Sequence, residues 1–137
     1  MEEKELQVGA KCFFKNKEGK ILLMRISDTC QKLPGWWDIP GGRIEKHEST
    51  EEGLKRELKE ETGIDFEKDF KIVDVQDIFP KVDNRHVIRL SFMAEMDEGL
   101  EIMLSSEHNE LGWFSVDEIL KMEKVDPFII DTLNKIK

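Results

Sequence analysis

A helix with a start signal and a stop signal constrains the fold of this chain more than any other stretch. Ser49 is a favourable N-cap residue, and Glu52, three residues later, completes the pattern of a capping box. Gly63 stands where helices commonly end in a left-handed glycine. The sequence therefore predicts a helix over residues 50–62.

Three glutamates crowd one side of this predicted helix. At about 100° per residue, Glu57, Glu60 and Glu61 fall within roughly 100° of arc, and Leu54 and Leu58 flank that arc and point to a core. Like charges at i, i+4 spacing destabilise a helix by roughly a few tenths of a kcal/mol. The arrangement therefore needs either solvent or a cation.

A solvated helix face is the simpler interpretation of a glutamate-rich helix. It would carry ordinary i, i+4 ion pairs between Glu51 and Lys55 and between Glu52 and Arg56. Those pairs lie away from the three glutamates and leave the arc short of basic partners. A divalent cation is the alternative, because hard carboxylate oxygens suit Mg²⁺ or Mn²⁺.

The stretch PGGRIEKHE leads into the helix and favours the cation. Gly41 and Gly42 allow the backbone to approach a ligand closely, and Glu48 adds a carboxylate near the helix start. Gly53 lies on the same side as the glutamates, and a glycine inside a helix costs roughly 1 kcal/mol relative to alanine. Close approach of another group to the backbone is one reason to accept that cost.

The remaining sequence predicts a sheet with helices packed on it, an α/β or α+β sandwich. A first hairpin turns at residues 16–19, a capping box at Ser115 and Glu118 starts a second helix, and Pro127 starts a third. The predicted strands cover residues 6–15, 20–27, 36–39, 70–79, 86–96, 99–105 and 110–115, and the later helices cover residues 115–123 and 127–137.

Composition narrows the class of protein. A chain of 137 residues is most simply one domain, residues 1–137. A formal net charge of −9 argues against binding to a nucleic-acid polymer, which relies on clustered Lys and Arg. The absence of a leader pattern or a long apolar stretch predicts a soluble protein with no membrane partner. Cys12 and Cys30 form no metal or redox motif, which favours a reducing cytoplasm.

The spacing of the charged and glycine residues carries a family resemblance. The pattern is Gly42, five residues, Glu48, seven residues, Arg56, Glu57, Leu58, one residue, Glu60, Glu61, one residue, Gly63 and Ile64. At every specified position this resembles the signature of the Nudix hydrolases, the MutT-like family. The resemblance implies an α/β/α sandwich around a mixed sheet. It also implies hydrolysis of a pyrophosphate link by water with Mg²⁺, for which Mn²⁺ can substitute.

The same resemblance implies roles for individual residues. Glu57, Glu60 and Glu61 would be metal ligands, together with the backbone carbonyl of Gly41. Glu57 is also a candidate base for the attacking water, although within the family the base is not always in this signature. The implied catalytic residues are therefore Glu57, Arg56 and Glu60.

Other positions of the pattern would support that site. Arg56 would orient a glutamate of the signature through a charge-assisted hydrogen bond, and Glu48 would support the geometry between loop and helix. Gly63 would end the helix, and Gly42 would lie against the substrate.

Outside the signature, a further carboxylate ligand is expected from the loop before the last strand. Glu107 and Glu110 are both available, and by its distance from Trp113 Glu107 better resembles the extra ligand of MutT-type enzymes. Arg25 is predicted to meet a phosphate, with a plain surface arginine as the alternative. Trp37 is a candidate for stacking on a base, although a core position for either Trp36 or Trp37 is the favoured interpretation. The three histidines, His47, His86 and His108, are predicted to be surface or strand residues without metal roles.

The sequence says less about the substrate. The expected ligand is a small nucleotide-type molecule, first a nucleoside triphosphate, including oxidised forms, cleaved to monophosphate and pyrophosphate. ADP-ribose or a nucleotide sugar is the close alternative, and a non-catalytic nucleotide-sensing module is the alternative of another class. The chain contains no tyrosine, which disfavours the dinucleoside polyphosphate hydrolases that use one beyond the signature. The resemblance also implies a homodimer.

Overall fold

The computed structural model describes residues 4–81 and 84–137. The predicted single domain, residues 1–137, thus includes residues 1–3 and 82–83, which lie outside the described residues. The strands are β1 (Glu5–Lys15), β2 (Ile21–Ile26), β3 (Trp37–Asp38), β4 (Gly41–Arg43), β5 (Lys71–Ile78), β6 (Arg85–Glu95) and β7 (His108–Phe114). The helices are α1 (Thr50–Thr62), α2 (Val116–Lys121) and α3 (Pro127–Ile136).

The predicted caps at the helix starts and the predicted end of α1 are confirmed, whereas α2 ends at Lys121 rather than at residue 123. The Ser49 side chain accepts a hydrogen bond from the Glu52 backbone N–H at 3.1 Å, which is one half of the predicted capping box, and Gly63 closes α1 with φ of +77°. Ser115 and Glu118 form a complete capping box at the start of α2. Pro127 occupies the first turn of α3.

The sheet is mixed, as predicted, and the two strands of its first hairpin diverge. β1 runs parallel to β6 over its whole length, and β5 is antiparallel to β6. β1 pairs with β2 only at Lys15 and Ile21, while β2 continues beside β7 and β3. β4 pairs with β1 opposite Gly9, Ala10 and Lys11. The two arms of the hairpin therefore enter different parts of the sheet.

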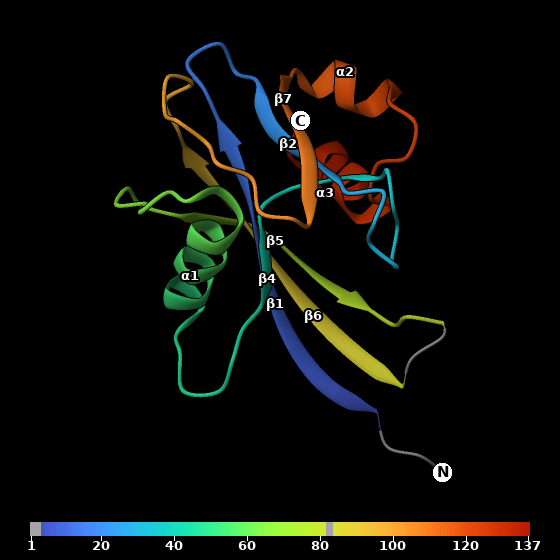
Figure 1. Cartoon of the computed structure of the whole chain (residues 1–137). Helices are drawn as coiled ribbons and strands as arrows, with labels where there is room; N and C mark the ends of the chain where they lie inside the picture. The colour runs from blue at the N-terminus through green and yellow to red at the C-terminus, as the bar shows by residue number, and fades with distance from the viewer. Residues whose placement is uncertain (1–3, 82–83) are drawn as a thin grey trace.

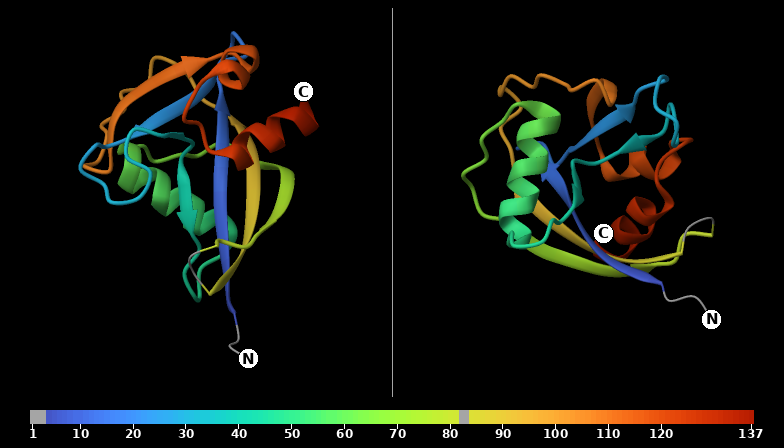
Figure 2. Two further views of the ribbon diagram at one scale, coloured as in Figure 1. Left: turned by 90° about the vertical axis from the view of Figure 1, so that its right-hand side faces the viewer. Right: turned by 60° about the horizontal axis from the view of Figure 1, so that its bottom comes forward.

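Helices cover both faces of the sheet, so the predicted α/β/α sandwich is confirmed (Figures 1 and 2). Alternation along β1 builds a core on each face, because successive side chains of a strand point to opposite sides. Cys12 and Phe14 pack with α1, whereas Phe13 packs in the cluster that contains residues of α2 and α3. Leu54 and Leu58 are fully buried in the first core and fix α1 against the sheet.

Two segments differ from the sequence prediction. Residues 41–43, which lie outside the predicted strands, form β4 because their backbone pairs with β1. The described residues 99–105, expected to be a strand, form none. Their backbone N–H groups instead serve the end of α1: Met103 donates to the Thr62 carbonyl at 2.9 Å and Ser105 to the Glu61 carbonyl at 3.2 Å. Within the described residues, none of the helices is long and apolar enough to cross a membrane.

Candidate active site

A cleft of about 680 Å³ lies where α1 meets the open hairpin. It collects charged side chains from segments that are far apart in the sequence. The lining residues are Lys11, Ile26, Cys30, Gln31, Lys32, Asp38, Gly41, Gly42, Glu57, Glu61, Glu107 and His108. Two of the three clustered glutamates of α1 therefore face this cleft.

Glu61 is the buried carboxylate of the cleft. Its Oε1 accepts a hydrogen bond from the Gly41 backbone N–H at 2.9 Å, and its side chain is 7% exposed. Burial raises the pKa of Glu61 to about 8, although Lys11 and the Gly41 hydrogen bond act in the opposite direction. A buried carboxylate with one oxygen left for another partner suits a cation ligand.

The raised pKa of Glu61 predicts how the stability of the metal-free protein depends on pH. The folded chain keeps a proton on Glu61 at pH values where the unfolded chain, with a pKa of about 4.3, has lost it. Stability contributed by Glu61 is therefore present at low pH and is lost as the pH rises from about 4.5 to about 8. In EDTA, we expect the free energy of unfolding to fall less over this range in Glu61→Gln than in the parent chain. Urea unfolding at several pH values measures both slopes, and equal slopes would contradict the assignment.

Arg56 connects the carboxylates at the mouth of the cleft. Its guanidinium donates to Glu48 at 2.8 and 3.1 Å, to Glu57 at 3.1 Å and to Glu60 at 3.4 Å. It also donates to the Arg43 carbonyl at 3.1 Å. The hydrogen bonds that Glu48 accepts, chiefly from Arg56 and also from the Glu45 backbone N–H, hold the pKa of Glu48 at about 2. Arg56 thus ties the loop before α1 to the glutamates on the helix.

This arrangement corrects two sequence-based interpretations. Glu57 and Glu60 do have a basic partner, because Arg56 turns towards them and towards Glu48 rather than forming the predicted pair with Glu52. The predicted pair between Glu51 and Lys55 is present at 3.5 Å. Helical spacing alone does not predict the bond to Glu48, because Glu48 lies before the helix, but the hydrogen bond from Arg56 to Glu57 agrees with the role that the family resemblance implies for Arg56.

The glycines make room for close approaches inside the protein. Gly41 has φ of +136°, and a Cβ there would lie 2.1 Å from the Ala10 carbonyl oxygen. A Cβ at Gly42 would lie 2.6 Å from the carboxyl carbon of Glu57. At Gly53, a Cβ would lie 2.5 Å from the Ile44 side chain, so the helix glycine accommodates the preceding loop.

Glu107 and His108 bring a second group of ligand atoms to the cleft. Glu61, Glu107 and His108 each offer one such atom, and these lie within 4.8 Å of one another. Glu107 lines the cleft, whereas Glu110 is an exposed residue of β7 paired opposite Arg25. The geometry therefore favours Glu107 over Glu110 as the additional carboxylate.

His108 is a strand histidine, which was one of its two predicted placements, because it begins β7. It is buried, with Nδ1 4.0 Å from Glu61 Oε2. Burial lowers the pKa of His108, although Asp38 acts in the opposite direction. His47 is exposed, and His86 stacks on Phe79 and contacts Asp77 at 2.7 Å.

Sequence reasoning missed a buried ion pair on the wall of the cleft. Lys11 Nζ donates to Asp38 at 2.8 Å, and both side chains are mostly buried. Burial alone would lower the pKa of Lys11, but Asp38 and Glu61 outweigh burial and raise it. Lys11 thus offsets part of the negative charge around Glu61. The available signal was a lysine in the middle of the apolar strand VGAKCFF.

Two predicted substrate contacts find other partners. Trp37 packs edge-on against Phe114, with ring centroids 5.4 Å apart, on the face covered by α2 and α3. It is not among the described residues that line the cleft, so the core alternative describes it better than base stacking. Arg25 donates to Asn109 at 3.0 Å and to Asp28 at 2.9 Å. The guanidinium that was expected to bind a phosphate therefore has two partners within the protein.

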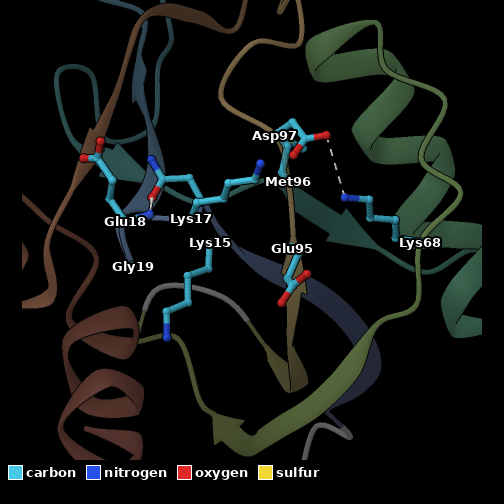
Figure 3. A pocket seen from close by; sticks show the side chains of 9 residues that line it. Lys15, Lys17, Glu18, Gly19, Lys68, Glu95, Met96 and Asp97 are labelled. Atoms are coloured by element: carbon cyan, nitrogen blue, oxygen red, sulfur yellow. Dashed lines mark hydrogen bonds and ion pairs between the residues drawn. The ribbon is translucent and has the colours of Figure 1, made fainter.

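A second hollow, of about 560 Å³, lies beside the turn between β1 and β2. Figure 3 shows Lys15, Lys17 and Lys68 around it, with Glu18 and Asp97 among them, and Lys68 pairs with Asp97 at 3.9 Å. Its charged groups are exposed and of both signs. The cleft with the buried Glu61 is therefore the better candidate for chemistry.

The cleft residues fit a divalent cation. Glu61, Glu107 and Glu57 supply the hard oxygen atoms that Mg²⁺ and Mn²⁺ prefer. The buried Nδ1 of His108 has no hydrogen-bond partner among the described residues, which also indicates a ligand beyond the protein chain. Within the same residues, Glu57 and Glu60 are not part of the group formed by Glu61, Glu107 and His108, and both pair with Arg56. They nevertheless line a smaller hollow together with Glu61 and Glu107.

Comparison with curated proteins finds relatives with related activities. The chain is 33% identical to a MutT-like protein of Streptomyces ambofaciens over 75% of this chain and 60% of that protein. It is 34% identical to an 8-oxo-dGTP diphosphatase of Proteus vulgaris over 67% of this chain and 77% of that protein. It is 30% identical to an ADP-ribose pyrophosphatase of Methanocaldococcus jannaschii over 77% of this chain and 60% of that protein.

The fold and the family agree with these relatives. The crystal structure of a MutT protein from Methanosarcina mazei superposes with a TM-score of 0.85 at 31% identity, covering 98% of this chain and 95% of that chain. The family model of the NUDIX domain matches residues 5–134, which include all the elements that build the cleft. The chain therefore belongs to the NUDIX domain family.

Proposed function

We propose that this protein is a divalent-cation-dependent pyrophosphohydrolase that converts a nucleoside triphosphate to a monophosphate and pyrophosphate. The observation that carries the proposal is the convergence of Glu57, Glu61 and Glu107 on one cleft. Such a set of carboxylates binds the cations that accompany polyphosphates. The family supports the reaction class, because named relatives cleave pyrophosphate links.

In this proposal, the carboxylates have two roles, cation binding and proton acceptance. Glu61 and Glu107 would hold the cation, and Glu57, Glu60 and the Gly41 carbonyl, the other ligands that the family resemblance implies, would lie beside it. A bound divalent cation neutralises phosphate charge and makes water more acidic. Glu57 accepts the proton of the attacking water. Burial raises the pKa of Glu57, although Arg56 opposes that shift, and a raised pKa makes the carboxylate a better base near neutral pH.

Arg56 has a positioning role in the same proposal. Its hydrogen bonds to Glu48 and Glu57 hold the Glu57 carboxylate in one place at the edge of the cleft. Glu48 in turn accepts a hydrogen bond from the Glu45 backbone N–H at 2.8 Å, which anchors the arginine to the loop. Gly42 then offers the substrate a surface without a side chain beside Glu57.

Two substrates follow from the relatives. The 8-oxo-dGTP diphosphatase favours a nucleoside triphosphate, including an oxidised one, and the ADP-ribose pyrophosphatase favours ADP-ribose as the second candidate. Both substrates place a pyrophosphate link near the carboxylates. They differ in what lies beyond it: a terminal phosphate or a second sugar.

The test is a panel of standard and oxidised nucleoside triphosphates, ADP-ribose and nucleotide sugars, assayed with Mg²⁺ and with EDTA. The proposal expects Mg²⁺-dependent release of monophosphate and pyrophosphate from a triphosphate. Release of AMP and ribose 5-phosphate from ADP-ribose would favour the second candidate instead. Stabilisation by a nucleotide without turnover of any compound would refute the enzyme and support a sensing module.

A further inference from the structure

His108 carries a buried nitrogen that the fold leaves without a partner. Its side chain is 5% exposed, and Nδ1 forms no hydrogen bond to any described residue. Buried polar atoms in folded proteins nearly always have a partner, because an unsatisfied one retains the full cost of losing water. Nδ1 therefore calls for a ligand that the described chain does not supply.

The neighbours of Nδ1 identify the chemistry of that ligand. Glu61 Oε2 lies 4.0 Å away, which is too long for a hydrogen bond. Two atoms that each lie about 2.1 Å from one ion can be at most about 4.2 Å apart, so both can bind the same ion. Glu107 offers a third atom within 4.8 Å, and its exposed side chain can adjust by rotation. A cation bound between these atoms would therefore satisfy His108 Nδ1 and Glu61 Oε2 together.

The backbone holds these groups in place before any ion arrives. The other oxygen of Glu61, Oε1, is bound to the Gly41 N–H, which leaves Oε2 facing His108. His108 is held at the start of β7 by pairing with Ile26 of β2 and by its own N–H, which donates to the Ser105 carbonyl at 3.2 Å. A site with rigid ligands binds an ion without first ordering them.

We propose that His108 Nδ1 is a nitrogen ligand, together with Glu61 and Glu107, of the cation in the cleft, and that this ligand makes the site prefer Mn²⁺ to Mg²⁺. Imidazole binds transition-metal ions readily, whereas Mg²⁺ prefers oxygen ligands throughout. The inference rests on the proposed function only in placing a cation in this cleft. It adds a ligand type and a metal preference that carboxylates alone would not give.

Electron paramagnetic resonance of Mn²⁺ bound to the parent protein tests the nitrogen ligand directly. Pulsed spectra are expected to show coupling between the Mn²⁺ electrons and a nearby ¹⁴N nucleus. Spectra of the bound ion without such coupling would overturn the proposal. This measurement needs no variant, so it decides even if a substitution at His108 prevents folding.

Calorimetric titration of Mn²⁺ and Mg²⁺ without nucleotide tests the metal preference. In His108→Gln, we expect the Mn²⁺ affinity to fall at least about tenfold and the Mg²⁺ affinity to change less than about threefold. The matched control is His86→Gln, because His86 contacts Asp77 and Phe79 and does not line the cleft. An equal loss for both ions would mean that His108 only positions Glu61, and no loss would remove it from the site.

These measurements separate this inference from the proposed function. Nitrogen-coupled Mn²⁺ in a protein that hydrolyses nothing would refute the hydrolase and leave the ligand assignment intact. Mg²⁺-dependent hydrolysis by a protein whose bound Mn²⁺ shows no nitrogen coupling would refute the ligand assignment and leave the hydrolase intact.

Discussion

Glu57→Gln is expected to lower kcat for the pyrophosphate substrate by about 10³-fold or more, which corresponds to about 4 kcal/mol of transition-state stabilisation. Glutamine keeps the size of the side chain but loses the charge and cannot accept a proton at neutral pH. Glu57 is 20% exposed at the edge of the cleft and is hydrogen-bonded to Arg56 at 3.1 Å. The substitution removes the proposed base without opening a hole in the core.

The matched control for this variant is Glu51→Gln on the same helix. Glu51 is exposed and pairs with Lys55 at 3.5 Å, so its loss removes one surface ion pair and nothing from the cleft. The assay is pyrophosphate release with saturating Mg²⁺, together with circular dichroism to establish that each variant folds. A folded Glu57→Gln variant with less than about a tenfold loss would move the base elsewhere, and Glu107 would be the next residue to test.

Local sequence signals were sufficient for α1 and its caps. Ser49, Glu52 and Gly63 act through hydrogen bonds between residues a few positions apart, so helical spacing alone predicts them. The same holds for Leu54 and Leu58, which the periodicity places in the core. Spacing also places Glu57 and Glu61 on one side of the helix, and both line the cleft.

Partners from distant segments could not be predicted in this way. The Glu61 carboxylate meets the Gly41 N–H, Lys11 and His108 only because β4, β1 and β7 meet beside α1. No short-range sequence pattern predicts these contacts. The predicted strand at 99–105 was wrong for the same reason: its apolar residues suggested a strand, but its N–H groups complete the end of α1 instead.

Substitutions in adjacent glycines are expected to separate the stability of the fold from its chemistry. At Gly41, an alanine Cβ would lie 2.1 Å from the Ala10 carbonyl oxygen and 2.7 Å from the Lys11 Cα, and φ is +136°. These contacts are with backbone atoms, which cannot move without breaking the pairing of β4 with β1. We therefore expect Gly41→Ala to destabilise the protein by about 3 kcal/mol or more, which lowers Tm by about 10 °C.

At Gly42, the obstructing group is the end of a side chain, and the result should be the opposite. A Cβ there would lie 2.6 Å from the Glu57 carboxyl carbon, and Glu57 can swing away at little cost to the fold. Gly42→Ala is expected to keep Tm within about 2 °C of the parent. It should lower kcat at least about tenfold, because the displaced carboxylate no longer holds its position.

Gly9→Ala is the control for both, because Gly9 lies in the same pair of strands and its Cβ would meet the Gly42 carbonyl oxygen at an ordinary 3.7 Å. Thermal unfolding and the hydrolysis assay should leave it close to the parent in both properties. If Gly42→Ala kept full activity, catalysis would not depend on the observed position of the Glu57 carboxylate. That result would contradict the role of Glu57 as the base. If Gly41→Ala kept the parent Tm, β4 would have to pair with β1 more loosely than the structure shows. The two neighbouring positions therefore test independently the backbone that shapes the cleft and the position of Glu57, the proposed base.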